Sequence, residues 1–251
     1  MLNRLLQAIE RSGQFALFML RVAGTTNTLW SLRKETFRHA MFIGVQAIPV
    51  VMLASAFSGI VMTIQIGYQL VSTPVLPPET LGAVVVPSLM LEMCALIPGL
   101  VMASRIGAAI AASLGTMRVT EQIDALDAMG IDPVAYLVAP RIAAATLTFP
   151  FLYVASCLTG ILFGGLAGEV MGYSTFEYFI AGAQRYFLPF DPMYGMLKSL
   201  AFGFLIAAIA CWKGFTTTGG ADGVGRAATE AVVASCVNIL VADYVLAEIL
   251  L

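Results

Sequence analysis

Two charged side chains interrupt apolar runs of the sequence, and their chemistry is the first feature that needs an explanation. Glu92 lies inside the run 81–104, and Lys198 lies near the start of the run 193–212. A charged side chain at the centre of a membrane helix costs about 2.5–3.5 kcal/mol on insertion scales, so each charge needs a partner, water or a function. The structural interpretation is an ion pair, either Glu92–Lys198 or Glu92–Arg105, but thirteen residues place Arg105 roughly 220° round a straight helix from Glu92, which excludes the second pair within one helix. The functional interpretation is that Glu92 and Lys198 line a wet cavity and bind a polar group there.

The remaining reactive residue types argue against catalysis. The glycine-rich stretch 219–225 is not followed by Lys-Ser or Lys-Thr, so the pattern of a nucleotide-binding loop is absent from the sequence. The cysteines form no C-x-x-C, and His39 is the only histidine, which argues against a metal or redox site. Asp124 and Asp127 form a D-x-x-D, but a second acidic cluster for a two-metal site is missing. We therefore predict no catalytic residue, no cofactor site and no metal site.

The composition indicates a membrane protein. Of the 251 residues, 59% are hydrophobic and 11% are charged, whereas soluble domains have about 25% charged residues. Too few charged residues remain to cover a soluble globule, which excludes an ordinary cytosolic enzyme and a disordered chain. The net charge of -2, without a basic cluster, argues against nucleic-acid binding. We predict an all-α polytopic membrane protein.

Apolar runs of about 20 residues or more predict five transmembrane helices. These spans cover about 43–66, 81–104, 142–168, 193–212 and 231–250. Basic residues precede the first span and recur between spans two and three and between spans four and five, whereas the opposite loops, 67–80 and 169–192, contain only Arg185. Since positive charge stays cytoplasmic, we predict the N-terminus inside and the C-terminus outside.

The third span also carries a repeat of small residues. Gly160, Gly164 and Gly168 recur at four-residue spacing. Small residues on one face let two membrane helices approach closely, so the repeat predicts helix packing and not a ligand site.

The N-terminal segment 1–40 is predicted to be an amphipathic helix and not a cleavable signal. Its apolar positions recur at helical spacing, with polar and charged residues on the other face. They are Leu2, Leu5, Leu6, Ile9 and Leu17 or Leu20. This pattern favours a helix that lies in the cytoplasmic membrane interface. The alternative is a helix packed on a soluble partner.

A second amphipathic segment lies between spans two and three, in the polar region 107–141. Thr120 is its predicted N-cap, because acids follow in the first turns, where the helix dipole favours them. Gly130 and Pro133 then end the helix. We predict a short cytoplasmic helix at about 119–129, whose apolar face needs a partner, either another protein or its own bundle. The acids are Glu121, Asp124 and Asp127, and the apolar stripe is Val119, Ile123, Leu126 and Met129 or Ile131.

Three stretches of this sequence resemble the MlaE (YrbE-like) permease family. They are GAAIAASLGTMRVTEQIDALDAMGIDPVAYLVAPR at 107–141, GFTTTGGADGVGRAATEAVVAS at 214–235, and the run from Glu92 to Arg105. The family supplies membrane subunits of ABC systems that move phospholipids and related lipids between membranes, and it includes related chloroplast lipid-import permeases. Leu91 stands where the family often has an arginine before the glutamate, and Ser113 stands where it often has a glutamate.

The resemblance implies a multi-subunit complex. It implies a permease domain at 41–251, a homodimer, and a coupling helix that matches 119–129. The implied partners are a cytoplasmic ABC ATPase dimer, which holds ATP and Mg²⁺, and an MCE-domain lipid-binding protein on the opposite side. The implied location is a bacterial inner membrane, with a plastid inner envelope as the alternative.

The predicted function is that of a transporter permease subunit and not of an enzyme. Closure of the ATPase is expected to push on the coupling helix, move spans two and three, and reshape a lipid cavity lined by Glu92 and Lys198. The expected coupling residues are Val119, Thr120, Glu121, Ile123, Asp124, Leu126, Asp127 and Met129. One alternative is a membrane enzyme that modifies lipids, since 222–227 partly resembles a phosphotransferase motif. Another is a passive channel or scaffold.

Overall fold

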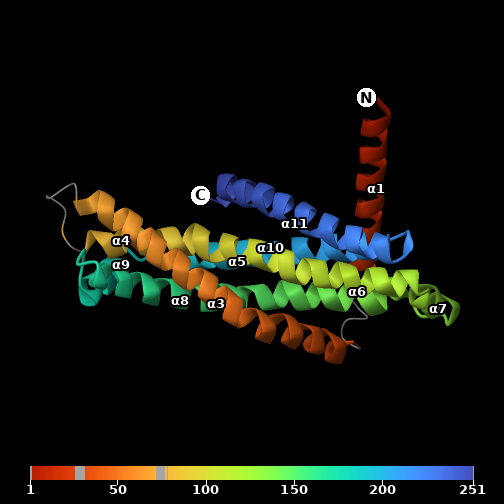
Figure 1. Cartoon of the computed structure of the whole chain (residues 1–251), viewed down its shortest axis with the longest axis horizontal. Helices are drawn as coiled ribbons and strands as arrows, with labels where there is room; N and C mark the ends of the chain where they lie inside the picture. The colour runs from red at the N-terminus through yellow and green to blue at the C-terminus, as the bar shows by residue number, and fades with distance from the viewer. Residues whose placement is uncertain (1, 26–31, 72–76, 78, 251) are drawn as a thin grey trace. The chain divides into compact units, whose positions relative to one another are not determined.

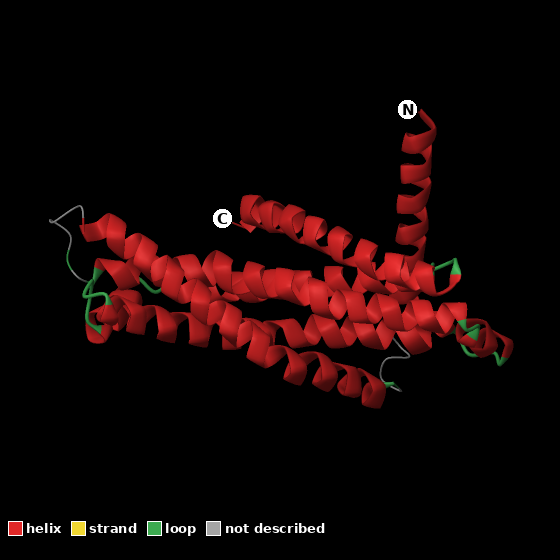
Figure 2. Cartoon of the chain, in the orientation of Figure 1, coloured by secondary structure: helices red, strands yellow, loops and turns green. Residues whose placement is uncertain are grey.

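Helices form all the regular structure in the residues that the computed structural model describes, which are 2–25, 32–71, 77 and 79–250. Figure 2 shows these helices joined by loops, with no strand in the described residues. Short π-helical turns, labelled η, interrupt the α-helices. The elements in chain order are α1 (Leu2–Gly24), α3 (Arg33–Val71), α4 (Thr80–Ser88), η1 (Leu89–Met93), α5 (Cys94–Met102), η2 (Ala103–Gly107), α6 (Ala108–Val119), α7 (Gln122–Ala128), η3 (Val134–Val138), α8 (Ala139–Val170), α9 (Phe176–Arg185), α10 (Phe190–Phe215) and α11 (Gly220–Leu250).

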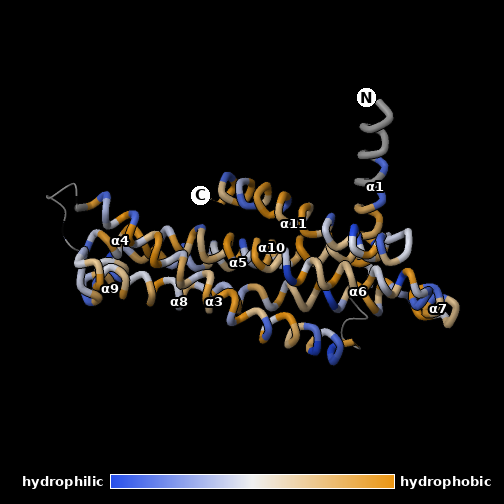
Figure 3. The backbone as a smooth tube through the Cα atoms, in the orientation of Figure 1, coloured by the Kyte–Doolittle hydropathy of each residue, from blue (hydrophilic) through white to orange (hydrophobic). Residues whose placement is uncertain are grey.

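Five helical stretches among the described residues are long and apolar enough to cross a membrane, which confirms the predicted fold class. They are Arg33–Leu70, Thr80–Val119, Val134–Val170, Phe190–Phe215 and Gly220–Leu250. Each is longer than the predicted span, because the helix continues into polar flanking residues. Figure 3 shows this pattern: the middle parts of the long helices are mostly apolar, and hydrophilic residues lie at the start of α3 and around α7. Residues 72–76 and 78 of the predicted outer loop 67–80 lie outside the described residues.

The chain forms two compact units, each assembled from separate stretches of sequence. Unit 1 comprises Met1–Ile43, Ala103–Leu147 and Gly203–Asn238, and unit 2 comprises Gly44–Met102, Thr148–Phe202 and Ile239–Leu251. Unit 1 therefore contains the segment predicted to be the coupling helix, and unit 2 contains Glu92 and Lys198.

The described part of the N-terminal segment contains the helix α1 (Leu2–Gly24), which packs within unit 1 through aromatic residues. The ring of Phe18 lies 5.1 Å from that of Trp212 and 5.6 Å from that of Phe215, centroid to centroid. Leu17 and Leu20 are exposed, so these two leucines are available to a membrane surface. The side chains of Leu2, Leu5, Leu6 and Ile9 lie outside the described residues. The membrane-interface location of α1 stays a prediction.

Small residues bring α3 and α8 close together in unit 2. A Cβ atom on Gly59 of α3 would overlap the backbone carbonyl of Gly160 of α8. One turn earlier on each helix, the hydroxyls of Ser55 and Ser156 are hydrogen-bonded at 2.5 Å. The glycine repeat of the third span is therefore a packing surface, as the sequence predicts.

The outer loop predicted at 169–192 contains a short helix that the sequence analysis missed. Thr175 caps α9, because its side chain accepts a hydrogen bond from the backbone N–H of Tyr178. Helix α9 packs on α4 (Figure 1). The contact is close because Gly82 meets the backbone of Phe179 and Gly182 meets the backbone of Glu79.

Candidate functional site

Lys198 is the centre of a charged cluster in unit 2. Its side chain has no exposed surface, and its Nζ lies 2.7 Å from Glu92 Oε2 and 2.6 Å from Asp243 Oδ1. These residues come from α10, from the π turn η1 and from α11. Two acids therefore share one base inside helices that are apolar enough to cross a membrane, where an unpaired charge is costly.

An aromatic ring closes one side of this cluster. Tyr194 lies one helical turn before Lys198 on α10, and Lys198 Nζ lies 4.9 Å from the centroid of its ring. A cation over an aromatic face is attracted by the ring quadrupole, more strongly where water is excluded. Phe190 stacks on Tyr194 with 6.0 Å between the ring centroids. The ammonium is therefore enclosed by carboxylates and a buried ring.

A π turn positions Glu92. In η1 the carbonyls are offset from the α-helical hydrogen-bond register, and some of them need other partners. The hydroxyl of Tyr153 donates to the carbonyl of Met90 at 2.9 Å, and Lys198 Nζ donates to the carbonyl of Leu91 at 3.4 Å. Lys198 thus binds both the Glu92 carboxylate and the backbone beside it, so the turn and the charged cluster stabilise each other.

The charged side chains of the cluster differ in exposure. The side chain of Glu92 is 35% exposed and that of Asp243 is 14% exposed, whereas Lys198 is fully buried. A group that approaches this cluster from outside therefore meets the carboxylate of Glu92 before it meets the ammonium.

Of the two ion pairs considered from the sequence, the structure contains the one that helix geometry allows. Glu92 pairs with Lys198, whereas Arg105 is exposed in the second π turn, η2, and belongs to unit 1. Asp243 is a cluster member that sequence reasoning missed. Its signal was present, because an acid inside the apolar run 231–250 needs the same explanation as Glu92.

The predicted coupling helix is shorter than the segment 119–129. Helix α6 continues to Val119, and α7 covers only Gln122–Ala128. Thr120 is not the N-cap of α7. It is the C-cap of α6, and its hydroxyl donates to the carbonyl of Thr116 at 2.8 Å. The cap position is Glu121, whose φ of 59° turns the chain between the two helices.

The apolar stripe of this segment is only partly covered by its own chain. Ile123 is buried and Leu126 is half-buried, whereas Val119 and Met129 are exposed. Asp124 forms an ion pair with Arg118 at 2.5 Å, which ties α7 to the end of α6. Glu121, Asp127 and Met129 are exposed.

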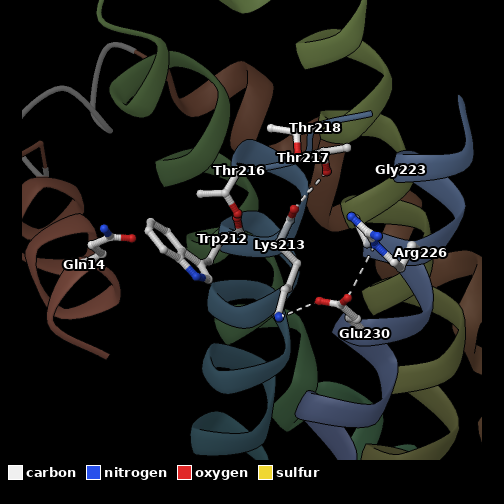
Figure 4. A pocket seen from close by; sticks show the side chains of 10 residues that line it. Gln14, Trp212, Lys213, Thr216, Thr217, Thr218, Gly223, Arg226 and Glu230 are labelled. Atoms are coloured by element: carbon white, nitrogen blue, oxygen red, sulfur yellow. Dashed lines mark hydrogen bonds and ion pairs between the residues drawn. The ribbon is translucent and has the colours of Figure 1, made fainter. Parts of the chain in front are cut away.

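A polar pocket of about 460 Å³ lies in unit 1 where α10 ends and α11 begins (Figure 4). Lys213 donates to Glu230 at 2.8 Å, and Arg226 Nε lies 3.8 Å from the same carboxylate. Figure 4 shows Gln14 of α1 facing the indole of Trp212 at one side. Lys213 and Arg226 share the one carboxylate of Glu230, so this part of the pocket carries more positive than negative charge.

The glycine-rich stretch at the start of α11 has a defined structural role at this pocket. Gly219 and Gly220 have φ values of 93° and 68°, a conformation that L side chains rarely adopt. Gly223 lies against the carbonyl of Thr218, where a Cβ atom would overlap it. These glycines therefore form a tight turn into the last predicted span.

Comparisons with known proteins match most of this chain. The family profile described as Permease MlaE matches residues 36–249. A probable ABC transporter permease protein of Rickettsia conorii is 36% identical over 249 residues, which are 98% of this chain and 95% of that protein. A probable ABC transporter permease protein of Synechocystis is 36% identical over 250 residues, 97% of this chain and 89% of that protein.

A plant relative extends the comparison beyond bacteria. Protein TRIGALACTOSYLDIACYLGLYCEROL 1, chloroplastic, of Arabidopsis thaliana is 36% identical over 215 residues. These residues are 86% of this chain and 61% of that protein. Its name contains the name of a glycolipid.

Proposed function

The chain belongs to the MlaE permease family and is an ABC transporter permease, and from this premise we propose that it moves phospholipids or related lipids between membranes. The observation that carries the lipid substrate is the identity to an Arabidopsis protein named for a glycolipid. The cluster of Lys198, Glu92 and Asp243 supports this proposal, because an amphiphile needs a polar contact among apolar walls.

An ABC transporter permease associates with ATPase subunits. We propose that an ATPase dimer binds ATP and Mg²⁺ and contacts the segment from Val119 to Met129, which includes α7. The exposed Met129 and the half-buried Leu126 support this placement, because they leave apolar surface outside the membrane spans. We also propose a homodimer, with an MCE-domain lipid-binding protein on the opposite side.

The chain is a multi-pass membrane protein. We propose a bacterial inner membrane as its location, with the N-terminus cytoplasmic and the C-terminus outside. The chloroplastic relative supports a plastid inner envelope as the alternative.

The test of this function is lipid transfer by the reconstituted complex. Proteoliposomes that contain the chain and its ATPase should transfer a fluorescent phospholipid to acceptor vesicles only when ATP is present. Glu92→Ala should lower the transfer rate about tenfold or more, because one hydrogen bond to a charged group contributes about 1.5–3 kcal/mol. Assembly should survive, because Lys198 keeps Asp243 and the carbonyl of Leu91 as partners.

The control is Glu79→Ala, which removes an acid of similar exposure that pairs with Arg185. It should leave the transfer rate unchanged. Transfer at the normal rate by Glu92→Ala would remove Glu92 from the mechanism. ATP hydrolysis without lipid transfer by the unmodified complex would contradict the proposed function itself.

A further inference from the structure

We propose, on the basis of the proposed lipid transport, that the head-group site of this permease is a hydrogen-bond acceptor built on the Glu92 carboxylate. It takes a head group that carries hydrogen-bond donors and no net negative charge. An ethanolamine ammonium and a sugar hydroxyl both have this chemistry. Lys198 does not bind the head group. It fixes the position of the Glu92 carboxylate through its contacts with that carboxylate and with the carbonyl of Leu91.

Lys198 is closed to a ligand. Its side chain has no exposed surface. An ammonium can only donate hydrogen bonds, and those of Lys198 point to Glu92 Oε2 at 2.7 Å and to the Leu91 carbonyl at 3.4 Å, with Asp243 Oδ1 at 2.6 Å. The ring of Tyr194 lies over the same nitrogen. A lipid phosphate therefore finds no open cation in this cluster.

The carboxylate of Glu92, in contrast, is accessible to a ligand. Its side chain is 35% exposed although it lies in a helix apolar enough to cross a membrane. A carboxylate accepts several hydrogen bonds, so the contact with Lys198 leaves acceptor capacity for a ligand. The neighbouring residue is Leu91, which adds no positive charge. The π turn η1, fixed by Tyr153 and Lys198, holds this carboxylate in one position.

The net charge of the cluster favours some head groups over others. The cluster contains two acids, Glu92 and Asp243, and one base, Lys198, so it attracts positive charge when all three are ionised. An anionic head group would place a like charge beside Glu92 within a helical stretch apolar enough to cross a membrane, and such an arrangement is costly. An ammonium would balance the charge and donate hydrogen bonds, and a sugar hydroxyl would donate without adding negative charge.

The experiment measures head-group preference in the complete complex. The chain is reconstituted with its ATPase, and ATP-driven transfer is compared for four lipids with identical acyl chains. Phosphatidylethanolamine offers an ammonium donor, and galactosyl diacylglycerol offers neutral hydroxyl donors. Phosphatidylcholine keeps the positive charge without a donor, and phosphatidylglycerol adds a negative charge.

We expect phosphatidylethanolamine and galactosyl diacylglycerol each to be transferred about tenfold faster than phosphatidylglycerol, which one charge-assisted hydrogen bond allows. Phosphatidylcholine should be transferred more slowly than the donor lipids. Glu92→Gln keeps an acceptor of the same size and removes the charge, so it should reduce the preference for ethanolamine over glycerol to about twofold. Glu79→Gln, which changes an acid that is 34% exposed, should leave that preference intact.

Three results would overturn this inference while leaving lipid transport in place. They are a preference for phosphatidylglycerol, equal transfer of phosphatidylcholine and phosphatidylethanolamine, and an unchanged preference in Glu92→Gln. If the unmodified complex hydrolyses ATP and transfers none of the four lipids, the proposed function fails and this inference fails with it.

Discussion

At the scale of single residues, the buried Lys198 is the position on which the cluster depends most. Its ammonium lies within 2.7 Å of two carboxylates from two other elements, and its side chain has no exposed surface. Removing one partner from a buried ion pair leaves an uncompensated charge, which costs more than the pair contributes. Loss of the lysine would leave Glu92 and Asp243 facing each other without a cation.

We therefore predict that Lys198→Met destabilises the folded protein by about 3–5 kcal/mol. Thermal unfolding in detergent measures this, with a thiol-reactive dye that reports exposure of the buried Cys94 and Cys157. Lys213→Met is the control, because the Lys213–Glu230 pair is partly exposed and should contribute about 1 kcal/mol or less. Adding Glu92→Gln and Asp243→Asn to Lys198→Met should recover part of the loss. Equal melting temperatures for the two lysine variants would contradict this account of the cluster.

The residue scale also shows what the sequence can reveal about the site. Glu92 and Lys198 stand out because charges inside apolar runs are rare and expensive. The sequence suggests the Glu92–Lys198 pair and places Asp243 inside an apolar run. That all three side chains meet in one cluster depends on which helices pack together, which a single sequence does not show. The same limit applies to Tyr153, whose hydroxyl finds the Met90 carbonyl across 63 residues of chain.

At the scale of elements, composition predicted the five spans but not their internal irregularities. Glu92 is part of the π turn η1, and Arg105 is part of the π turn η2. The spacing of hydrophobic residues does not distinguish a π turn of five residues from an α-helix. The prediction that Thr120 caps α7 was wrong, because Glu121 occupies the cap position in a left-handed conformation that non-glycine residues seldom show. Helix α9 was missed because a mixed polar and apolar segment between two spans is typical of a loop.

Helix packing in unit 2 gives a prediction at the scale of elements. Gly59→Ala should destabilise the protein by about 1–3 kcal/mol, because its Cβ would overlap the Gly160 carbonyl and push α3 from α8. Gly13→Ala in α1 is the matched control, since a Cβ at Gly13 has no atom within 4 Å. That change should be neutral or slightly stabilising, because alanine favours a helix more than glycine does. Thermal unfolding of both variants in detergent checks the pair, and equal effects would contradict the close approach of α3 and α8.

At the scale of the whole molecule, the distribution of charge predicts how the chain works with partners. Basic residues at 33, 118, 141, 213 and 226 fall in segments predicted to be cytoplasmic, and α7 lies between two of those positions. The chain is an ABC transporter permease, and its sequence lacks the pattern of a nucleotide-binding loop. We therefore propose that ATP hydrolysis on another polypeptide drives its conformational change. The short helix α7, with Ile123 buried and Met129 exposed, is the element proposed to contact that polypeptide.

The most direct test of this account is site-specific photo-crosslinking from Met129 in native membranes. Met129 is 66% exposed at the end of α7, and Met171, which is 52% exposed in the predicted outer loop, is the matched control. A photoreactive amino acid at Met129 should form an adduct with a nucleotide-hydrolysing subunit, identified by mass spectrometry, and the same group at Met171 should not. Adducts from Met129 that contain only its own polypeptide would contradict the proposal that an ATPase drives this permease through α7.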